Sequence, residues 1–205
     1  MAVDRRVART KKNIYIAFFT LLQKKGMDEI TVTELARAAD VDRKTFYSHY
    51  QTVQDVFVEF KQGVYDKVAE VLDECETRGA ENQARLNAGE SMDRAEDLAP
   101  FDFVYFYDTM HQVMVENLPF FEKLSRDSSS MFLKNDFKNV LKQAILDKYP
   151  ECPGISPYTQ SLYTEFIAAG TISMWTDWLH HKQVPMEEFR DSAIEVLREA
   201  WKMGT

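Results

Sequence analysis

The sequence predicts an all-α protein of about nine helices, and three observations support this prediction. The 205-residue chain has only seven glycines and six prolines, whereas β proteins use many Gly, Asn and Pro residues in their turns. Apolar residues recur at the three- and four-residue spacing of amphipathic helices. Thr and Asp residues that can cap a helix stand directly before several of these runs.

Two helices are expected before residue 40. Residues 7–25 form the first amphipathic pattern, and Gly26 is expected to end that helix as a C-terminal glycine. The next helix is expected to begin after Thr31. This threonine can cap the third amide while Glu34 reaches back to the cap, which completes a capping box.

A third short helix is expected over residues 43–49. Residues 40–42 form a tight turn before it, and Asp42 has the side chain of a good N-cap. Phe46 and Tyr50 fall on the buried face of this helix, so its other face is left to solvent or to a partner.

The rest of the chain continues as helices separated by one polar segment. After Thr52, which is a further N-cap, a long helix is expected from 53 to about 78. Residues 79–100 have almost no large apolar side chains, so a loop or a partly helical connection is expected there. Further helices are expected around 101–121, interrupted at Pro119, and over 129–149, 157–182 and 186–203.

Charge is distributed unevenly along the chain, whose formal net charge is −8. Residues 1–62 carry 11 Lys and Arg against 8 Asp and Glu, which gives +3. Residues 63–205 carry 14 against 25, which gives −11. A polyanionic partner is therefore expected at the N-terminal end, with an acidic remainder that limits non-specific binding to polyanions.

Several classes of protein are disfavoured. No run approaches 18 consecutive apolar residues, so no membrane span is expected. The basic N-terminus lacks the apolar core of a signal peptide, and Cys75 and Cys152 form no CxxC pair, which together indicate a cytoplasmic protein. The motifs GxGxxG, GxxxxGK[ST], GxSxG and HExxH are absent, so no enzyme is expected. His180 and His181 fit no standard metal site, so no metal or cofactor is expected.

Three helices with a tight turn between the second and third form the pattern of a helix-turn-helix, which places its last helix in the major groove of DNA. Arg43 and Lys44 are the first residues of that helix. Arginine can bind guanine through two hydrogen bonds, and lysine can do the same or contact a phosphate. Thr45 is expected to meet a thymine methyl group or a phosphate, whereas Tyr47 and His49 suit phosphate contacts.

The block ITVTELARAADVDRKTFYSHYQTVQDVF resembles the DNA-binding domain of the TetR family of bacterial transcriptional regulators. The resemblance spans about residues 10–62. The residues that match are Thr31, Thr33, Leu35, Ala36, Ala39, Val41, Thr45, Phe46, Tyr47, His49 and Tyr50. The C-terminal pattern AAGTISMWTDWL, followed by PMEEF, is similar to a subgroup of the family that is common in Firmicutes.

The resemblance implies a ligand-responsive repressor that binds a palindromic double-stranded DNA operator as a homodimer. Residues 1–52 would be the N-terminal arm and DNA-binding domain, 53–78 a connecting helix, and 79–205 a helical ligand-binding and dimerisation domain. Helices 157–182 and 186–203 would pair with their mates in the dimer. The effector would be a small molecule.

Three residues depart from the pattern of the family. Asp40 stands where the turn usually has glycine, Asp42 where serine caps the helix, and Val53 where a lysine binds phosphate. Together they suggest a weaker grip on the DNA backbone, which a basic N-terminal segment would offset. The alternative interpretation is that this basic segment contacts no DNA and only increases solubility. The remaining expected DNA contacts are Thr31, Thr33, Arg5, Arg6 and Arg9.

These departures keep a second hypothesis open, in which the chain is a co-regulator or protein-interaction module of the same fold with a weakened DNA reader. Gly170, in the middle of the helix expected over 157–182, indicates how helices pack in the dimer or in the subunit. Glycine inside a helix costs about 1 kcal/mol relative to alanine, which indicates a close helix contact. That contact is either with the dimer mate or with helix 186–203 of the same subunit.

Methionine and aromatic residues are dense over 101–132 and 158–178. Such residues pack ordinary cores, and they also line adaptable apolar pockets. We expect an effector pocket there, with polar groups interleaved to orient the ligand. The expected lining residues are Tyr107, Met110, His111, Met114, Phe121, Tyr163, Phe166 and Met174.

Overall fold

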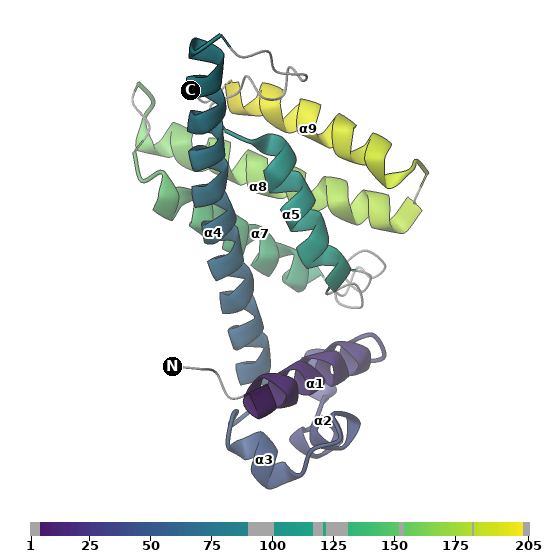
Figure 1. Ribbon diagram of the computed structural model, residues 1–205. Helices are drawn as coiled ribbons and strands as arrows, with labels where there is room; N and C mark the ends of the chain where they lie inside the picture. Colours follow the sequence, from purple (N-terminus) through teal and green to yellow (C-terminus); the bar gives the residue numbers. More distant parts are fainter. Residues whose placement is uncertain are drawn as a thin grey trace.

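The computed structural model describes residues 5–89, 101–116, 121, 131–151, 154–181 and 183–202 (Figure 1). Within these segments the chain forms eight α-helices and one short 3-10 helix, and no strand. The predicted all-α class is therefore confirmed. The elements are α1 (Arg5–Leu22), η1 (Met27–Glu29), α2 (Val32–Ala38), α3 (Arg43–Tyr47), α4 (Val53–Asn87), α5 (Phe103–Glu116), α7 (Met131–Lys148), α8 (Pro157–His181) and α9 (Met186–Lys202).

The three N-terminal helices and the start of α4 enclose one apolar core (Figure 1). Each helix contributes side chains that solvent does not reach. Burying a large apolar side chain stabilises a fold by about 1.5–3 kcal/mol. This small core therefore fixes the positions of α2 and α3 on α1. Its most deeply buried members are Ile14, Phe18, Leu22, Leu35, Phe46 and Val56.

Two local predictions in this region are wrong. Gly26 does not end α1 in the left-handed conformation, because its φ of −65° and ψ of 155° are extended and it begins η1 instead. Its N–H donates to the Glu29 carboxylate at 2.7 Å. Thr31 caps α2 as predicted by accepting from the Glu34 N–H, but the Glu34 side chain binds Lys25 and does not reach back to the cap.

Helix α4 is longer than predicted, because it continues to Asn87 and spans 35 residues. Residues 79–87 were expected to be part of a loop, since they lack an apolar stripe. They consist mostly of Ala, Glu, Gln and Arg, which have high intrinsic helix propensity, so the helix continues without a buried face. Residues 90–100, the remainder of the predicted loop, lie outside the described residues. Figure 1 shows α4 running from the N-terminal helices along the C-terminal ones.

Helices α5, α7, α8 and α9 pack with the distal part of α4 around a second core (Figure 1). At its centre Tyr107 of α5 stacks on Trp175 of α8, with ring centroids 4.6 Å apart. Phe189 of α9 packs edge-on against Trp175 at 5.0 Å. Three helices are therefore joined through one aromatic cluster. In the described part of the chain no helix is long and apolar enough to cross a membrane.

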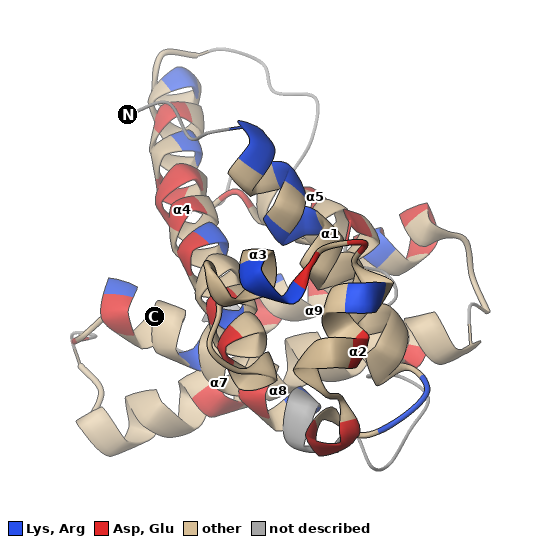
Figure 2. Ribbon diagram, turned by 90° about the horizontal axis from the view of Figure 1, so that it is seen from below, with Lys and Arg blue, Asp and Glu red and all other residues tan. Residues whose placement is uncertain are grey.

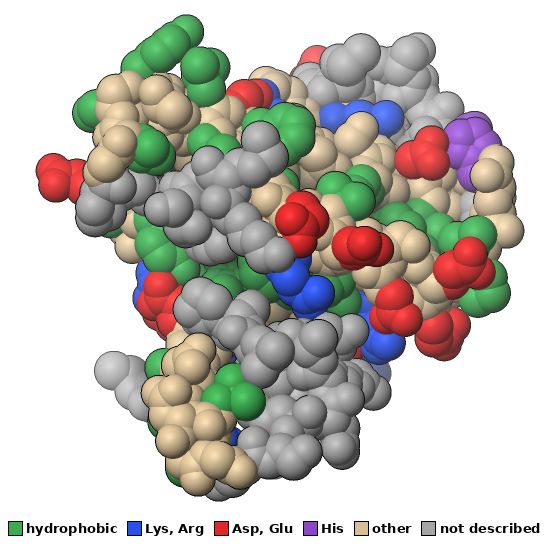
Figure 3. All heavy atoms as spheres, turned by 90° about the horizontal axis from the view of Figure 1, so that it is seen from above, with side chains coloured by type: hydrophobic (Ala, Val, Ile, Leu, Met, Phe, Trp, Pro, Cys, Tyr) green, Lys and Arg blue, Asp and Glu red, His purple; other side chains and the backbone are tan. Residues whose placement is uncertain are grey.

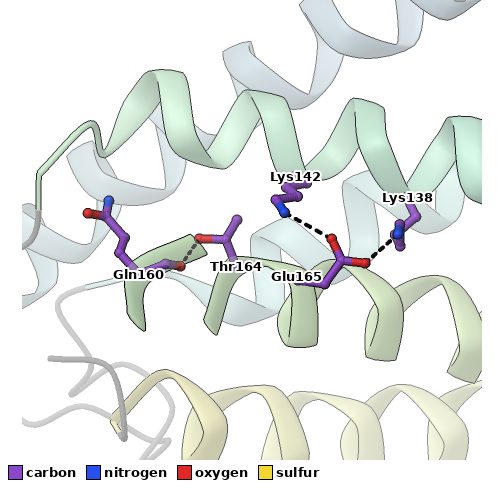
Figure 4. Close-up of polar contacts among 5 residues, drawn as sticks. All are labelled: Lys138, Lys142, Gln160, Thr164 and Glu165. Carbon is purple, nitrogen blue, oxygen red and sulfur yellow. Dashed lines mark hydrogen bonds and ion pairs between the residues drawn. The ribbon is translucent and has the colours of Figure 1, made fainter. Parts of the chain in front are cut away.

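A carboxylate on α8 joins that helix to α7 (Figure 4). Glu165 accepts hydrogen bonds from Lys138 and from Lys142, the latter at 3.0 Å. The pKa of Glu165 lies below its usual value because of these two ammonium groups, Lys138 first. The preceding residue on α8 is Thr164, whose hydroxyl donates to the Gln160 carbonyl one turn earlier in the same helix at 2.9 Å.

Candidate DNA-binding interface and effector cavity

Helix α3 is held at its start by the predicted cap. The Asp42 carboxylate accepts from the Thr45 N–H at 2.7 Å and from the Thr45 hydroxyl at 3.0 Å. The helix is shorter than the predicted 43–49, because it ends at Tyr47 and the Ser48 hydroxyl donates to the Thr45 carbonyl at 2.7 Å. Four of the five residues of α3 were expected to contact DNA, namely Arg43, Lys44, Thr45 and Tyr47.

The inner face of α3 is anchored by two aromatic rings. Phe46 and Tyr50 are both buried, and their ring centroids lie 5.7 Å apart. Burial raises the pKa of the Tyr50 hydroxyl far above its usual value, so this group stays neutral. The ammonium group of Lys11 lies 5.7 Å from the centre of the Tyr50 ring and pairs with Glu59 of α4 at 2.6 Å. Helices α1, α3 and α4 are thus connected beneath the interface.

The outer face of α3 carries Arg43, Lys44 and Tyr47, which are all exposed. The Arg43 guanidinium lies 5.8 Å from the centre of the Tyr47 ring, a distance at which a cation is attracted to the aromatic face. Neither Arg43 nor Lys44 forms an ion pair with any described residue. Cations at a helix N-terminus are opposed by the helix dipole, so this arrangement favours an external anion. We call these three residues the recognition tip.

The other predicted DNA contacts lie around this tip. Thr31 and Thr33 are exposed at the start of α2, whereas Thr45 and His49 are half-buried beside the tip. Because α1 begins at Arg5, the basic residues Arg5, Arg6 and Arg9 lie on the first two helical turns and are exposed. Val53, which replaces the lysine of the family pattern, is buried in the core and offers no contact.

The surface charge is divided between the two ends of the molecule. Figure 2, seen from the side of the helix-turn-helix, shows Lys and Arg at the start of α1 and on α3. Figure 3, seen from the opposite side, shows many more Asp and Glu than Lys and Arg among the coloured side chains. A polyanion would therefore be attracted to the α3 end and repelled from the other.

Asp40, which stands where the turn of the family pattern has glycine, adopts the left-handed conformation with φ of 55°. The Val41 N–H donates to the Ala36 carbonyl at 3.0 Å and closes the turn. The substitution Asp40→Gly is expected to raise the free energy of unfolding by up to about 1 kcal/mol, because glycine has no Cβ to strain this backbone. Chemical denaturation checks this, with Asp40→Ala as the control that lowers stability. If both variants changed the free energy of unfolding equally, the backbone at Asp40 would not be strained by its Cβ.

Asp42 gives a testable dependence on pH. Hydrogen bonds from the Thr45 backbone and side chain hold the pKa of Asp42 below its usual value. A depressed pKa means that the cap stabilises the fold at pH above the usual value for Asp and loses this effect as pH falls through the folded-state pKa. Asn can cap without titrating. The variant Asp42→Asn is therefore expected to show a smaller fall in melting temperature between pH 5 and about pH 3 than the wild type, and an identical fall would refute the assignment.

A cavity of about 60 Å³ lies between α4, α5, α7 and α8. Of the eight residues that were expected to line a pocket, three do so, namely Met110, Met114 and Phe121. Phe137 and Trp175 also line it and were not predicted. They lie on different helices, and no pattern along one helix shows that they face each other.

The other five predicted pocket residues lie outside the cavity wall. Tyr107 and His111 both stack on Trp175, and burial lowers the pKa of His111. Tyr163 donates its hydroxyl to the Ala200 carbonyl on α9. Met174 packs half-buried against the C-terminal core, and Phe166 is 62% exposed.

An exposed apolar stripe runs along α8. Tyr158, Leu162 and Phe166 are 73%, 53% and 62% exposed and are spaced four residues apart, which places them on one helix face. Gly170 continues this spacing. A Cβ atom at Gly170 would meet nothing within 4 Å, so this glycine makes no close contact with α9 in the same subunit.

Residues 17–60 match the family described as "Bacterial regulatory proteins, tetR family". This segment is therefore similar to the DNA-binding domain of that family. The matched segment includes α2, the turn and α3, and the matching family consists of regulators of transcription. The match ends at residue 60, so the expected subgroup of the C-terminal part stays a prediction.

A relative and two solved structures extend the comparison. The chain is 29% identical over 89 residues to the "Uncharacterized HTH-type transcriptional regulator YxbF" of Bacillus subtilis (strain 168). This alignment covers 43% of the chain and only 23% of that relative. The fold resembles that of the "Dihydroxyacetone kinase operon activator DhaS", with a TM-score of 0.54, 17% identity and coverage of 95% of this chain and 97% of that one. It also resembles a "tetR-family transcriptional regulator from Streptomyces coelicolor", with a TM-score of 0.57, 15% identity and coverage of 100% and 83%. At these identities the two structures support the fold of the chain alone.

Proposed function

We propose that the chain is a cytoplasmic, ligand-responsive repressor that binds a palindromic DNA operator as a homodimer. The observation that supports this most strongly is the recognition tip. Arg43 and Lys44 stand exposed at the capped start of α3, form no ion pair with any described residue, and lie above two buried aromatic rings. A cationic helix start on a rigid base suits the major groove, where side chains near the start of the recognition helix read base edges.

The α8 stripe supports the dimer. Three large apolar side chains exposed at four-residue spacing form the kind of patch that marks a protein interface. An α8–α8 contact would cover them, with Gly170 allowing the two helices to approach closely. Two copies of the tip would then face successive major grooves, which lie about 34–36 Å apart along the DNA.

Phe137 supports a link between the cavity and the DNA-binding domain. It lines the cavity and also packs on Phe57 and Phe60 of α4, with ring centroids 6.5 and 5.8 Å away. Phe60 in turn packs edge-on against Phe19 of α1 at 4.6 Å. A ligand that moves Phe137 would therefore shift the start of α4, and with it the separation of the two tips. Such a ligand must bind better to the state that does not bind DNA.

A mobility-shift titration tests the function. The DNA would be the region upstream of the gene, together with duplexes selected by the protein from a random-sequence library. We expect saturable binding that falls steeply with salt, because neutralised phosphates release counterions. If the folded protein binds no duplex but does bind a second protein tightly, the co-regulator hypothesis replaces the repressor.

The sign of regulation requires a second measurement. The name of one structural relative describes an operon activator. A transcription assay with the selected operator placed at a promoter is expected to show less transcript when the protein is added. More transcript would make the chain an activator and leave its DNA binding unchanged.

A further inference from the structure

Thr171 lines the cavity and carries a hydroxyl that makes no hydrogen bond with any described residue. The residue is 4% exposed. Two other threonines of α8 behave differently. Thr164 donates to the Gln160 carbonyl at 2.9 Å, and Thr176 donates to the Ser173 carbonyl at 3.0 Å. The Thr171 hydroxyl makes no such bond with the described residues, so it is available to a polar group of a molecule in the cavity.

The rest of the described cavity wall is apolar. Its side chains are aliphatic, aromatic or thioether groups, apart from Thr171 and Thr176. The Thr176 hydroxyl already donates its proton within α8. The described wall includes no Lys, Arg, His, Asp or Glu. An ion would lose its hydration here and gain no counter-charge from the described wall, which costs several kcal/mol.

The size of the cavity limits the ligand. About 60 Å³ is less than the roughly 150 Å³ of an apolar cavity that binds benzene. A second cavity of about 20 Å³ lies beyond a shared wall formed by Phe106, Leu141 and Thr171. A ligand of one ring would enter by displacing flexible wall residues such as Met110, and a short substituent would extend toward the second cavity.

We propose that the cavity binds an uncharged molecule of about one aromatic ring, whose single polar group hydrogen-bonds to the Thr171 hydroxyl. Thr171 then determines specificity among apolar compounds of this size. This inference rests on the proposed function, since it names the class of effector that the regulator would sense. It also accounts for a threonine that departs from the bonding pattern of its own helix.

Three probes of matched shape test the proposal by calorimetric titration of the full chain. These are p-cresol, p-xylene and p-toluate, which carry a hydroxyl, a methyl and a carboxylate group on the same methylbenzene. We expect p-cresol and p-xylene to bind and p-toluate to bind at least about 100-fold more weakly. The variant Thr171→Val is expected to weaken p-cresol about fivefold, the effect of one hydrogen bond of about 1 kcal/mol, and to leave p-xylene unchanged.

The variant Thr176→Val is the matched control and is expected to leave both affinities within about twofold, because its hydroxyl serves the helix. If Thr171→Val does not fold, Thr171→Ser keeps the hydroxyl and is expected to keep p-cresol binding. The comparison of the three probes on the wild type still tests whether the cavity excludes a charged ligand. Binding of p-toluate as tight as that of p-cresol, no binding of p-cresol, or equal losses of p-cresol and p-xylene in Thr171→Val would overturn the proposal. Mobility shifts on the same sample distinguish a failure of the proposed effector class from a failure of the proposed DNA-binding function. DNA binding without probe binding refutes only the effector class, and probe binding without DNA binding refutes only the regulator.

Discussion

Replacing Arg43 and Lys44 together by alanine is expected to weaken operator binding at least about 30-fold. An arginine that reads guanine contributes about 1–3 kcal/mol, and a lysine on a phosphate adds to it. Both side chains are exposed and lack ion pairs among the described residues, so the fold does not depend on them. Removing cations from a helix N-terminus even favours the helix. Mobility shifts measure the affinity, and thermal melting measures the stability.

The control for this variant removes two cations elsewhere. Lys67 and Arg85 lie on the middle and distal parts of α4, away from α3 (Figure 1). The double variant Lys67→Ala/Arg85→Ala changes the net charge by the same amount and is expected to bind the operator within about threefold of the wild type. Equal losses in the two double variants would mean that net charge, and not the recognition tip, determines binding.

Placing charges on the α8 stripe is expected to separate the dimer. In a symmetric interface each substitution occurs twice, so Leu162→Glu/Phe166→Glu buries four carboxylates or breaks the contact. We expect the dissociation constant of the dimer to rise at least about 100-fold, since central apolar residues of an interface each contribute about 2 kcal/mol or more. Both side chains are mostly exposed in the subunit, so the monomer is expected to stay folded.

Sedimentation equilibrium measures this change. Val58→Glu/Val115→Glu is the matched control, because both valines are exposed and lie on other helices, α4 and α5. That control is expected to stay dimeric. The stripe variant is also expected to lose most of its operator affinity, because one tip alone contacts one half-site. A stripe variant that remains a dimer would place the interface on another face.

The features that could be predicted from the sequence are local ones. The caps at Asp42 and Thr52, the left-handed Asp40 and the buried Phe46 each depend on residues within a few positions. Side-chain caps and single-residue backbone preferences act over one turn, so the sequence around them contains the whole cause. Gly26 is the exception among these local features, because it is the N-cap of a 3-10 helix that the sequence did not predict.

Features that depend on distant contacts could not be predicted. Helix α4 continues to Asn87 although its last turns bury almost no apolar surface, because propensity alone sustains it. The cavity wall depends on how α5, α7 and α8 face each other, so Met110 and Phe137 share it while Phe166 points to solvent. Methionines and aromatic rings occur equally in walls, cores and interfaces, and only the packing separates these roles.

Hydroxyl-radical footprinting on DNA selected by the protein is the most direct test of two recognition tips carried by one symmetric pair. We predict two protected segments related by a dyad, with centres one helical turn or about 34–36 Å apart. The Arg43→Ala/Lys44→Ala variant should protect neither. A single protected segment, or protection that this variant leaves intact, would contradict the account.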